Sequence, residues 1–451
     1  MELGAALSHA RLDTMQVLDV GGRYALRLAR THDPGVDWSR FNHDFDSDSL
    51  RCDDPTILGD ADSRALLKRL GAYACFEVLQ DLLREGRHQL FTLRVEPQLG
   101  MRLGLFIHSS TMGRANGMHA LRAGGLRLHA PGTPELEVIA DGCNLSRAMS
   151  YKNAAADLPM GGCKLTLQAE PLSTDDLPRL GFLAYCIESA RILTGPDMGF
   201  RPEHVDALRE HFTQHCTGGN LGPLGPTGVP TAFGVFLAIR EAARHAFGSP
   251  DLTGRTVAVQ GLGFVGRPLA EHLAAAGAQL VVADTDATAV ARLHQLLGPV
   301  QVVHPDEIIT VPCDILAPCA RGGVLDEASI DALKCKLVFG AANNPLKAFT
   351  KEGEIRLARR MASRGVLFQI DWLHNTAGVM SGFEEYLRGP EATQEHLRPR
   401  LERVCKDGTA EVLRTAAARG ITPTEYAYEK IETRLFPQDP VEAPSGSGAG
   451  G

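Results

Sequence analysis

The chain has 451 residues, of which 44% are hydrophobic and 22% charged, and its net charge is −8 at pH 7. Its length predicts two domains and rules out a small single-core protein, and its negative charge argues against general nucleic-acid binding. The ten cysteines form no Cys-x-x-Cys pair, which favours reduced thiols over disulfides and predicts no metal site. No apolar run is long enough to span a membrane, and Met1–Leu7 does not suit a signal peptide. We therefore expect a cytoplasmic protein without a membrane partner.

In chain order, residues 1–65 are acidic and irregular in pattern, and we expect an N-terminal extension of unknown role. Residues 66–217 are predicted to form the first domain, to which the family resemblance given below assigns substrate binding and oligomerisation. Around its start, the apolar spacing of Ser63–Glu85 predicts a helix, and alternation in Leu90–Val95 and Leu103–His108 predicts two strands. Ser173–Leu193 is predicted to be a further amphipathic helix.

Two lysines stand out in this region. Lys152 lies in an Ala-rich, helix-forming stretch, and Lys164 closely follows a predicted turn at Pro159-Met160-Gly161-Gly162. This arrangement can bring two ammonium groups into one pocket. One can hold a substrate carboxylate, while its charge and partial burial lower the pKa of the other enough for proton transfer near neutral pH.

A Gly/Pro-rich stretch at 218–228 predicts a hinge, and strands then alternate with helices over 229–400. The expected fold class is therefore α/β, with an N-terminal α/β substrate domain, a C-terminal Rossmann-type doubly wound dinucleotide-binding domain, and a cleft between them. Residues 401–440 are expected, from the same resemblance, to be helices that return to the substrate domain, and the composition of 441–451 predicts a flexible tail.

The strongest local motif is Gly-x-Gly-x-x-Gly, between a predicted strand at Arg255–Gln260 and a predicted helix at Arg267–Ala276. The first glycine allows a tight turn, the second lets a pyrophosphate approach the backbone, and the third lets helix and strand pack closely. The residues expected to bind the cofactor here are Gly261, Leu262, Gly263, Phe264, Val265 and Gly266.

A second predicted strand, Gln279–Ala283, ends at Asp284. This acid stands near the spacing expected for a residue that binds the adenosine ribose. Asp286 adds a second negative charge nearby. Because both charges would repel a 2′-phosphate, the sequence predicts NAD as cofactor and disfavours NADP.

From about Ala72 to about residue 430, the chain resembles the Glu/Leu/Phe/Val amino acid dehydrogenases. The stretches that carry the resemblance are Ile107–Gly113, the two-lysine segment, Thr194–Gly199, Pro230–Val235, the dinucleotide motif, Cys313–Ala320, Gly340–Leu346 and Asp371–Asn375. The resemblance implies reversible oxidative deamination of an L-amino acid to its 2-oxo acid, ammonia and NADH. It also implies a homo-oligomer.

The resemblance further implies roles for single residues. Lys152 would pair with the substrate α-carboxylate, Lys164 would be the catalytic lysine that activates water, and Asp197 would relay protons to and from the amino group. Five residues are expected around the nicotinamide, its ribose or the substrate: Thr231, Cys319, Ala320, Asn343 and Asn344.

Substrate choice is expected to depend on Asn116, Gly195 and Leu373, where the branched-chain enzymes of the family carry leucine, alanine and valine. The Gly195 and Leu373 pair resembles the phenylalanine dehydrogenases, so a large, aromatic amino acid is expected. Glutamate is disfavoured, because the glutamate enzymes carry a lysine where Asn116 stands. Leucine, valine and tryptophan stay open as substrates.

One departure from the family pattern concerns the loop after Gly113. The family usually reads Gly-Gly-x-Arg there, and this chain is expected to carry Gly117-Met118-His119-Ala120 in its place. Gly117 and Met118 are accordingly expected beside the substrate. The bulky Met118 motivates a different class of function, a non-catalytic protein that senses NAD or an amino acid.

Overall fold

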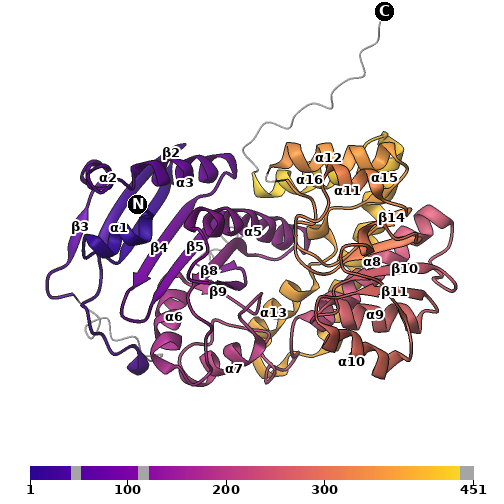
Figure 1. Ribbon diagram of the computed structural model, residues 1–451, viewed down its shortest axis with the longest axis horizontal. Helices are drawn as coiled ribbons and strands as arrows, with labels where there is room; N and C mark the ends of the chain where they lie inside the picture. Colours follow the sequence, from indigo (N-terminus) through magenta and orange to yellow (C-terminus); the bar gives the residue numbers. More distant parts are fainter. Residues whose placement is uncertain (42–51, 110–120, 349, 437–451) are drawn as a thin grey trace, which may run out of the picture.

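The computed structural model describes residues 1–41, 52–109, 121–348 and 350–436. In these residues the chain forms two sheets, one in each half of the molecule (Figure 1). Indigo to magenta segments build the half around the first sheet, and most of the red to yellow segments build the half around the second. The predicted α/β fold with two such halves is confirmed.

The first sheet is mixed, with antiparallel pairs at one end and parallel pairs around β6 and β7. Its order is β3 (Thr56–Leu58), β2 (Arg23–Arg30), β1 (Thr14–Val20), β4 (Leu90–Glu96), β5 (Met101–Ser109), β8 (Gly161–Gln168), β6 (Arg122–Ala123) and β9 (Ile192–Leu193), and β7 (Leu126–His129) also pairs with β8. Strands β4 and β5 confirm the two strands predicted from alternation.

The N-terminal residues are part of this sheet. β1 pairs with β2 on one side and with β4 on the other. In β2, Tyr24, Leu26 and Leu28 are buried, whereas Arg23 and Arg27 are exposed, which is the period of a half-buried strand. The prediction that this region is irregular is therefore wrong for the described residues 1–41 and 52–65.

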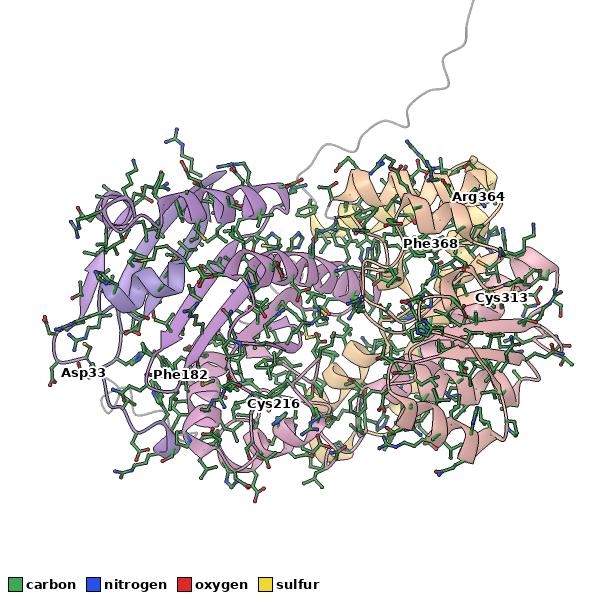
Figure 2. All side chains as sticks on the ribbon, viewed as in Figure 1. Asp33, Phe182, Cys216, Cys313, Arg364 and Phe368 are labelled. Carbon is green, nitrogen blue, oxygen red and sulfur yellow. The ribbon has the colours of Figure 1, made fainter. Side chains whose placement is uncertain are left out.

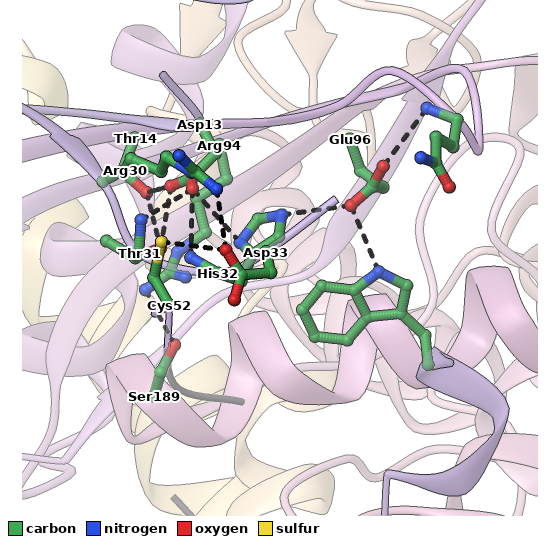
Figure 3. Close-up of polar contacts among 12 residues, drawn as sticks. Asp13, Thr14, Arg30, Thr31, His32, Asp33, Cys52, Arg94, Glu96 and Ser189 are labelled. Carbon is green, nitrogen blue, oxygen red and sulfur yellow. Dashed lines mark hydrogen bonds and ion pairs between the residues drawn. The ribbon is translucent and has the colours of Figure 1, made fainter. Parts of the chain in front are cut away.

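A buried polar cluster fixes the ends of these first strands (Figure 3). His32 lies between two carboxylates, with Nδ1 3.4 Å from Asp13 Oδ2 and Nε2 3.1 Å from Glu96 Oε2. Trp38 Nε1 donates to the same Glu96 oxygen over 3.2 Å. Asp13 also accepts the backbone N–H of Thr31 at 2.7 Å. The cluster thus connects the start of β1, the segment after β2 and the end of β4.

Two apolar cores cover the two faces of the first sheet. Leu103 of β5 faces a core that contains Phe182 of α6 (Leu177–Ala190) (Figure 2). Phe106 of the same strand points to the opposite face, into a core shared with α3 (Tyr73–Glu85). The alternation along β5 therefore serves two cores at once.

The described helices of this half include α3 and α6, and the others are α1 (Leu3–His9), the 3-10 helix η1 (Trp38–Arg40), α2 (Asp60–Arg69), α5 (Glu135–Ala155) and α7 (Pro202–His211). The single helix predicted at Ser63–Glu85 is instead the pair α2 and α3. Gly71 between them has a φ of 70°, which ends a right-handed helix. Helix α6 is shorter than predicted, because Asp176 caps its start and Arg191, with a φ of 49°, follows its end.

Helix α5 packs directly on β8, and this contact brings the two lysines together. Lys152 lies in the last turn of α5 and Lys164 lies on β8. Gly161 and Gly162 begin this strand and do not form the predicted turn. A Cβ at Gly162 would lie 2.1 Å from the amide nitrogen of Ser150 in α5. Only glycine permits so close an approach of helix and strand.

The second sheet is parallel throughout. Its order is β12 (Gln301–Val302), β11 (Gln279–Ala283), β10 (Thr256–Gln260), β13 (Ile315–Pro318), β14 (Leu337–Val338) and β15 (Leu367–Phe368). Numbered along the chain, this is the 3-2-1-4-5-6 order of the Rossmann fold. Strands β10 and β11 confirm the two strands predicted around the glycine motif.

The described helices of the second half are α8 (Gly228–Phe247), α9 (Gly266–Ala275), α10 (Ala287–Leu297), η2 (Ile308–Thr310), α11 (Glu327–Ala332), α12 (Lys351–Ser363), η3 (Asp371–Leu373), α13 (Ala377–Arg388), η4 (Gly389–Glu391), α14 (Gln394–Leu401), the π-helix η5 (Glu402–Asp407), α15 (Gly408–Arg419) and α16 (Pro423–Leu435). Helix α16 contacts α5, where Tyr151 Oη donates to Glu432 Oε1 over 2.9 Å. Among the helices that the structure describes, none is long and apolar enough to cross a membrane.

Candidate active site

A cavity of about 630 Å3 opens between the two halves and takes its walls from both. This volume is typical of sites for small molecules. From the first half come Lys152, Lys164 and Asp197, and from the second come Thr231 and Asn343. The predicted cleft therefore contains both predicted lysines.

Lys164 and Asp197 form a buried ion pair, in which Lys164 Nζ donates to Asp197 Oδ2. Arg127 of β7 approaches the other oxygen of Asp197, with Nη2 3.3 Å from Oδ1. Nη1 of Arg127 also donates to both oxygens of Asp141, at 3.1 and 3.2 Å. The side chain of Lys164 is only 4% exposed. Bulk water therefore has little access to these charges.

Burial and neighbouring charges shift the pKa values of this cluster. Burial is the main cause that lowers the pKa of Lys164; Asp197 opposes this shift and Arg127 reinforces it. Burial alone would raise the pKa of Asp197, but Lys164 and Arg127 hold it well below its usual range. Burial lowers the pKa of Lys152 to about 8. A lysine with a lowered pKa can exchange protons near neutral pH.

Lys152 reaches across the cleft to the second half. Its Nζ donates to Asn343 Oδ1 over 2.6 Å. Asn375 Nδ2 donates to the same oxygen at 3.2 Å and to Asp371 Oδ2 at 3.2 Å. The residue expected to hold the substrate carboxylate and a residue expected beside the nicotinamide ribose are thus direct neighbours.

The glycine motif forms the turn between β10 and α9. Gly261 has a φ of 89°, which permits the turn. A Cβ at Gly266 would lie 1.9 Å from the carbonyl oxygen of Gly261, whereas a Cβ at Gly263 would meet no atom of the described part of the chain within 4 Å. The turn is therefore closed where helix and strand pack and open where a pyrophosphate would approach, beside the N–H groups of the first turn of α9. These residues fit a dinucleotide.

Asp284 follows β11 beside this turn. Its Oδ2 accepts the amide of Leu262 at 2.6 Å, and its Oδ1 accepts the amide of Asp286 at 2.8 Å. Each oxygen retains a lone pair for a ribose hydroxyl. Asp286 instead caps α10, since its side chain accepts from the amide of Thr288.

The structure brings half of the predicted site residues to the cavity wall, and these are Lys152, Lys164, Gly195, Asp197, Thr231, Phe264, Val265, Cys319, Ala320 and Asn343. The remaining motif residues lie in the turn beside it. Asn344, which has a φ of 48°, donates its backbone N–H to Asp371 Oδ2 at 3.2 Å and does not line the cavity. Asn116, Gly117 and Met118 lie outside the described residues, so their roles stay predictions.

The structure does not place Leu373 in the cavity wall, so its role stays a prediction. Its side chain is buried in the apolar core of the second half, with Trp372. The short helix η3 directs it inward. Asn375 and Gly378, a few residues further on, form that part of the cavity wall.

The expected loss of the Gly-Gly-x-Arg motif is wrong, because Gly124-Gly125-Leu126-Arg127 has this pattern and lies at the cavity. A Cβ at Gly124 would lie 1.7 Å from Cys163 O, and one at Gly125 would lie 3.2 Å from Pro196 O. Both glycines therefore let this segment approach its neighbours. Arg127 lies at the cavity in contact with Asp197, and this pattern is the signal in the sequence that could have identified it.

Comparison with known proteins agrees with this geometry. A family model described as Glutamate/Leucine/Phenylalanine/Valine dehydrogenase matches residues 283–435. Leucine dehydrogenase of Thermoactinomyces intermedius is 34% identical over 311 residues, which cover 68% of this chain and 81% of the relative. Phenylalanine dehydrogenase of Lysinibacillus sphaericus is 34% identical over 357 residues, which cover 77% of this chain and 88% of the relative.

Among solved structures, L-tryptophan dehydrogenase from Nostoc punctiforme matches with a TM-score of 0.60 and 28% identity, over 79% of this chain and 98% of that protein. A hetero-hexameric glutamate dehydrogenase from Thermus thermophilus matches with a TM-score of 0.60 and 21% identity, over 81% of this chain and 96% of that protein, and shares the fold. The resemblance seen in the sequence is thus confirmed. This chain belongs to the Glu/Leu/Phe/Val dehydrogenase family and is an amino acid dehydrogenase.

Proposed function

We propose that this enzyme catalyses the reversible, NAD-dependent oxidative deamination of a large, aromatic L-amino acid to its 2-oxo acid and ammonia. The observation that carries the proposal is the buried ion pair of Lys164 and Asp197. It lies in one cavity with Lys152 and with the part of the dinucleotide turn formed by Phe264. These groups suit chemistry at an α-carbon that bears a carboxylate and an amine.

The nicotinamide cofactor would accept a hydride from Cα. Lys152 would hold the α-carboxylate with its ammonium group. Lys164, with its lowered pKa, would take a proton from the water that attacks the substrate iminium. Asp197 would accept and return the protons of the amino group, since it touches Lys164 directly. The small exposure of these side chains would protect the iminium from bulk water.

The choice of NAD over NADP follows from Asp284. Its two oxygens hold backbone amides of the turn, so the carboxylate is fixed where the adenosine ribose is expected. A fixed negative charge favours two ribose hydroxyls and repels a 2′-phosphate. Asp286 adds to this repulsion from the start of α10.

The preference for a large side chain is supported by Gly195. It lies in the cavity wall, and among the described residues the one atom that a Cβ there would approach is Thr217 O, at 3.0 Å. A missing methyl group leaves room for a larger substrate, but it is worth only about 1 kcal/mol. Leucine, valine and tryptophan therefore compete with phenylalanine for the same cavity.

The test is formation of NADH with a panel of L-amino acids at alkaline pH, beside the same panel with NADP. We expect turnover to be fastest with aromatic substrates and NAD. Lys164→Ala should lower kcat by about 100-fold or more, which is the usual contribution of a general base. Tight NAD binding without turnover on any amino acid would favour the sensing function and contradict this proposal.

We also propose a homo-oligomer, since oligomers are implied by the family resemblance and the glutamate dehydrogenase of similar fold is a hexamer. Light scattering of the purified protein tests this point. A monomeric mass at working concentration would contradict it.

A further inference from the structure

Asp371 is a buried carboxylate behind the wall of the cavity. It begins η3 and is 1% exposed. Its Oδ2 accepts hydrogen bonds from the Asn344 amide and from Asn375 Nδ2, both at 3.2 Å. Its Oδ1 is buried and has no hydrogen-bond partner among the described residues. A buried carboxylate of this kind is unfavourable unless an opposite charge compensates it.

That opposite charge comes from Lys152, which is connected to Asp371 through two asparagines. Asn343 Oδ1 accepts from Lys152 Nζ at 2.6 Å and from Asn375 Nδ2 at 3.2 Å. Asn375 Nδ2 in turn contacts Asp371 Oδ2. The charge of Asp371 raises the pKa of Lys152, and the charge of Lys152 lowers the pKa of Asp371. Each residue thus favours the charged form of the other.

Charges of both signs lie near Lys152 and Asp371. The other ionisable groups that act on this pair are Lys164 of β8, Arg127 of β7, Asp197, Glu354 of α12 and His374. Lys164 and Arg127 disfavour the charged form of Lys152, and Asp197 is already shared between these two cations. Of the two carboxylates that favour the charged form of Lys152, Asp197 pairs with Lys164 and Arg127, which leaves Asp371 as the carboxylate that compensates Lys152.

We propose that Asp371 is a positioning residue, which keeps Lys152 protonated and, through Asn375 and Asn343, directs its ammonium group to the substrate carboxylate. This inference rests on the proposed function, in which Lys152 binds that carboxylate. Asp371 itself lies behind the wall and does not touch the substrate.

The proposal gives a definite pH dependence. Burial lowers the pKa of Lys152 to about 8 and raises that of Asp371 to about 6, so both are charged between these values. Replacing Asp371 by asparagine removes a charge that favours protonated Lys152. The pKa of Lys152 then falls further, and the lysine loses its proton at a lower pH.

The experiment measures binding of the 2-oxo acid to the enzyme–NADH complex, by NADH fluorescence, from about pH 6 to about pH 9. In Asp371→Asn the pH at which affinity for the 2-oxo acid is lost should be lower by at least about one unit than in the wild type. Near pH 8 the variant should therefore bind the 2-oxo acid about tenfold more weakly. KM should rise more than kcat falls. Asp314→Asn is the matched control, because Asp314 pairs with Arg255 at the start of β13, away from the cavity.

An unchanged pH dependence in Asp371→Asn would overturn the inference while leaving the proposed function in place. If the wild-type protein neither binds 2-oxo acids nor oxidises any amino acid, the proposed function fails first. Asn375→Ala provides a second test should Asp371→Asn not fold. This variant removes the hydrogen bonds that connect Asp371 to Asn343 but keeps the charge of Asp371. KM should therefore rise without a shift in pH dependence, and an unchanged KM would contradict the positioning role.

A second, independent observation concerns two cysteines in the second sheet. Ile315 of β13 pairs in parallel with Leu337 of β14. Cys313 and Cys335 each stand two residues earlier, and Cys313 N donates to Lys334 O over 3.5 Å, which brings the two cysteines close together. The interaction between their thiol groups raises the pKa of Cys313 and lowers that of Cys335. Adjacent strands lie about 4.8 Å apart, within the about 4.4–6.8 Å that separates the Cα atoms of a disulfide.

We infer that Cys313 and Cys335 are a site of reversible oxidation. With hydrogen peroxide as oxidant, one thiol forms a sulfenic acid and releases water, and the second thiol displaces another water to form the S–S bond. Two protons and two electrons leave the cysteine pair, and the peroxide is reduced to two waters. Figure 2 shows Cys313 on the side of the second half that faces away from the first sheet, so the bond would form away from the cavity.

Intact mass and peptide mapping after peroxide treatment test this second inference. We expect the loss of two hydrogen masses, a crosslinked peptide that contains both cysteines, and reversal by a dithiol. Cys313→Ser and Cys335→Ser should each abolish the crosslink, whereas Cys75→Ser, a half-buried cysteine elsewhere, should retain it. Absence of the crosslink in the wild type, or its persistence in Cys313→Ser, would overturn the inference.

Discussion

Arg127 Nη2 lies 3.3 Å from Oδ1 of Asp197, so Arg127 and Lys164 each hold one oxygen of the same buried carboxylate. Arg127 is itself fixed by Asp141, whose oxygens lie 3.1 and 3.2 Å from Nη1. Two cations keep Asp197 ionised and fix the direction of its carboxylate. Proton transfer at Asp197 should therefore depend on Arg127 as well as on Lys164.

Arg127→Met removes one of these cations and leaves two carboxylates short of a partner. Breaking a buried pair on one side costs about 3–5 kcal/mol of unfolding free energy. The pKa of Asp197 should rise, because one of the charges that lowers it is lost, and kcat/KM should fall about tenfold or more. Urea unfolding and initial rates measure the two effects. Arg127→Lys keeps the charge but lacks the planar guanidinium group, so its stability and kcat/KM should lie between those of the wild type and Arg127→Met. Wild-type stability and rates in Arg127→Met would contradict this role of Arg127.

The pH profile of kcat/KM should be bell-shaped. On the acidic side activity rises as Lys164 loses its proton and becomes a base, and burial brings its pKa below the ordinary value. On the alkaline side activity falls as Lys152 loses the proton that holds the carboxylate, with a pKa of about 8 in the free enzyme. Lys152→Arg should move the alkaline fall to higher pH, because arginine stays charged. A fall at the same pH in this variant would assign it to another group.

Strands β10 and β11 of the second sheet could be predicted closely from the sequence, because their central residues are buried on both faces. Short apolar runs such as Val257–Val259, which is fully buried, end at a glycine and leave little ambiguity. The placement of Lys152 on a helix could also be predicted, whereas Lys164 lies on a strand and does not follow the predicted turn.

The predictions that differ from the structure concern residues whose placement depends on the path of the backbone between regular elements. The place of Gly124–Arg127 beside β8 could not be predicted by counting from Ile107–Gly113, because spacing along the sequence does not reveal which glycine packs against the strand. Leu373 was assigned to the pocket because its position in a motif does not reveal the turn of η3 that directs it into the core. A sequence motif shows which residues are available, but the direction in which Leu373 points and the neighbours of Gly124 depend on backbone geometry.

Two glycines near the cavity should respond very differently to alanine. A Cβ at Gly124 would lie 1.7 Å from Cys163 O, a backbone atom that cannot move aside without displacing β8. Gly124→Ala should therefore lose most activity together with stability. Gly195→Ala meets Thr217 O at 3.0 Å and should fold. Its added methyl should lower the ratio of kcat/KM for phenylalanine over leucine by about tenfold; an unchanged ratio would remove Gly195 from the side-chain pocket.

Asp284 and Asp286 offer a matched pair for testing cofactor choice. Asp284 holds the Leu262 amide at 2.6 Å beside the glycine turn, so Asp284→Ala removes both this anchor and the acceptor for a ribose hydroxyl. KM for NAD should rise about tenfold or more, and the preference for NAD over NADP should shrink, because a fixed repulsive charge is gone. Asp286 caps α10, and Asp286→Ala should cost about 1 kcal/mol of stability with a much smaller change in KM. Initial rates with both cofactors, beside thermal unfolding, separate the two effects. If Asp286→Ala changes the cofactor preference more than Asp284→Ala does, the ribose-binding acid is Asp286.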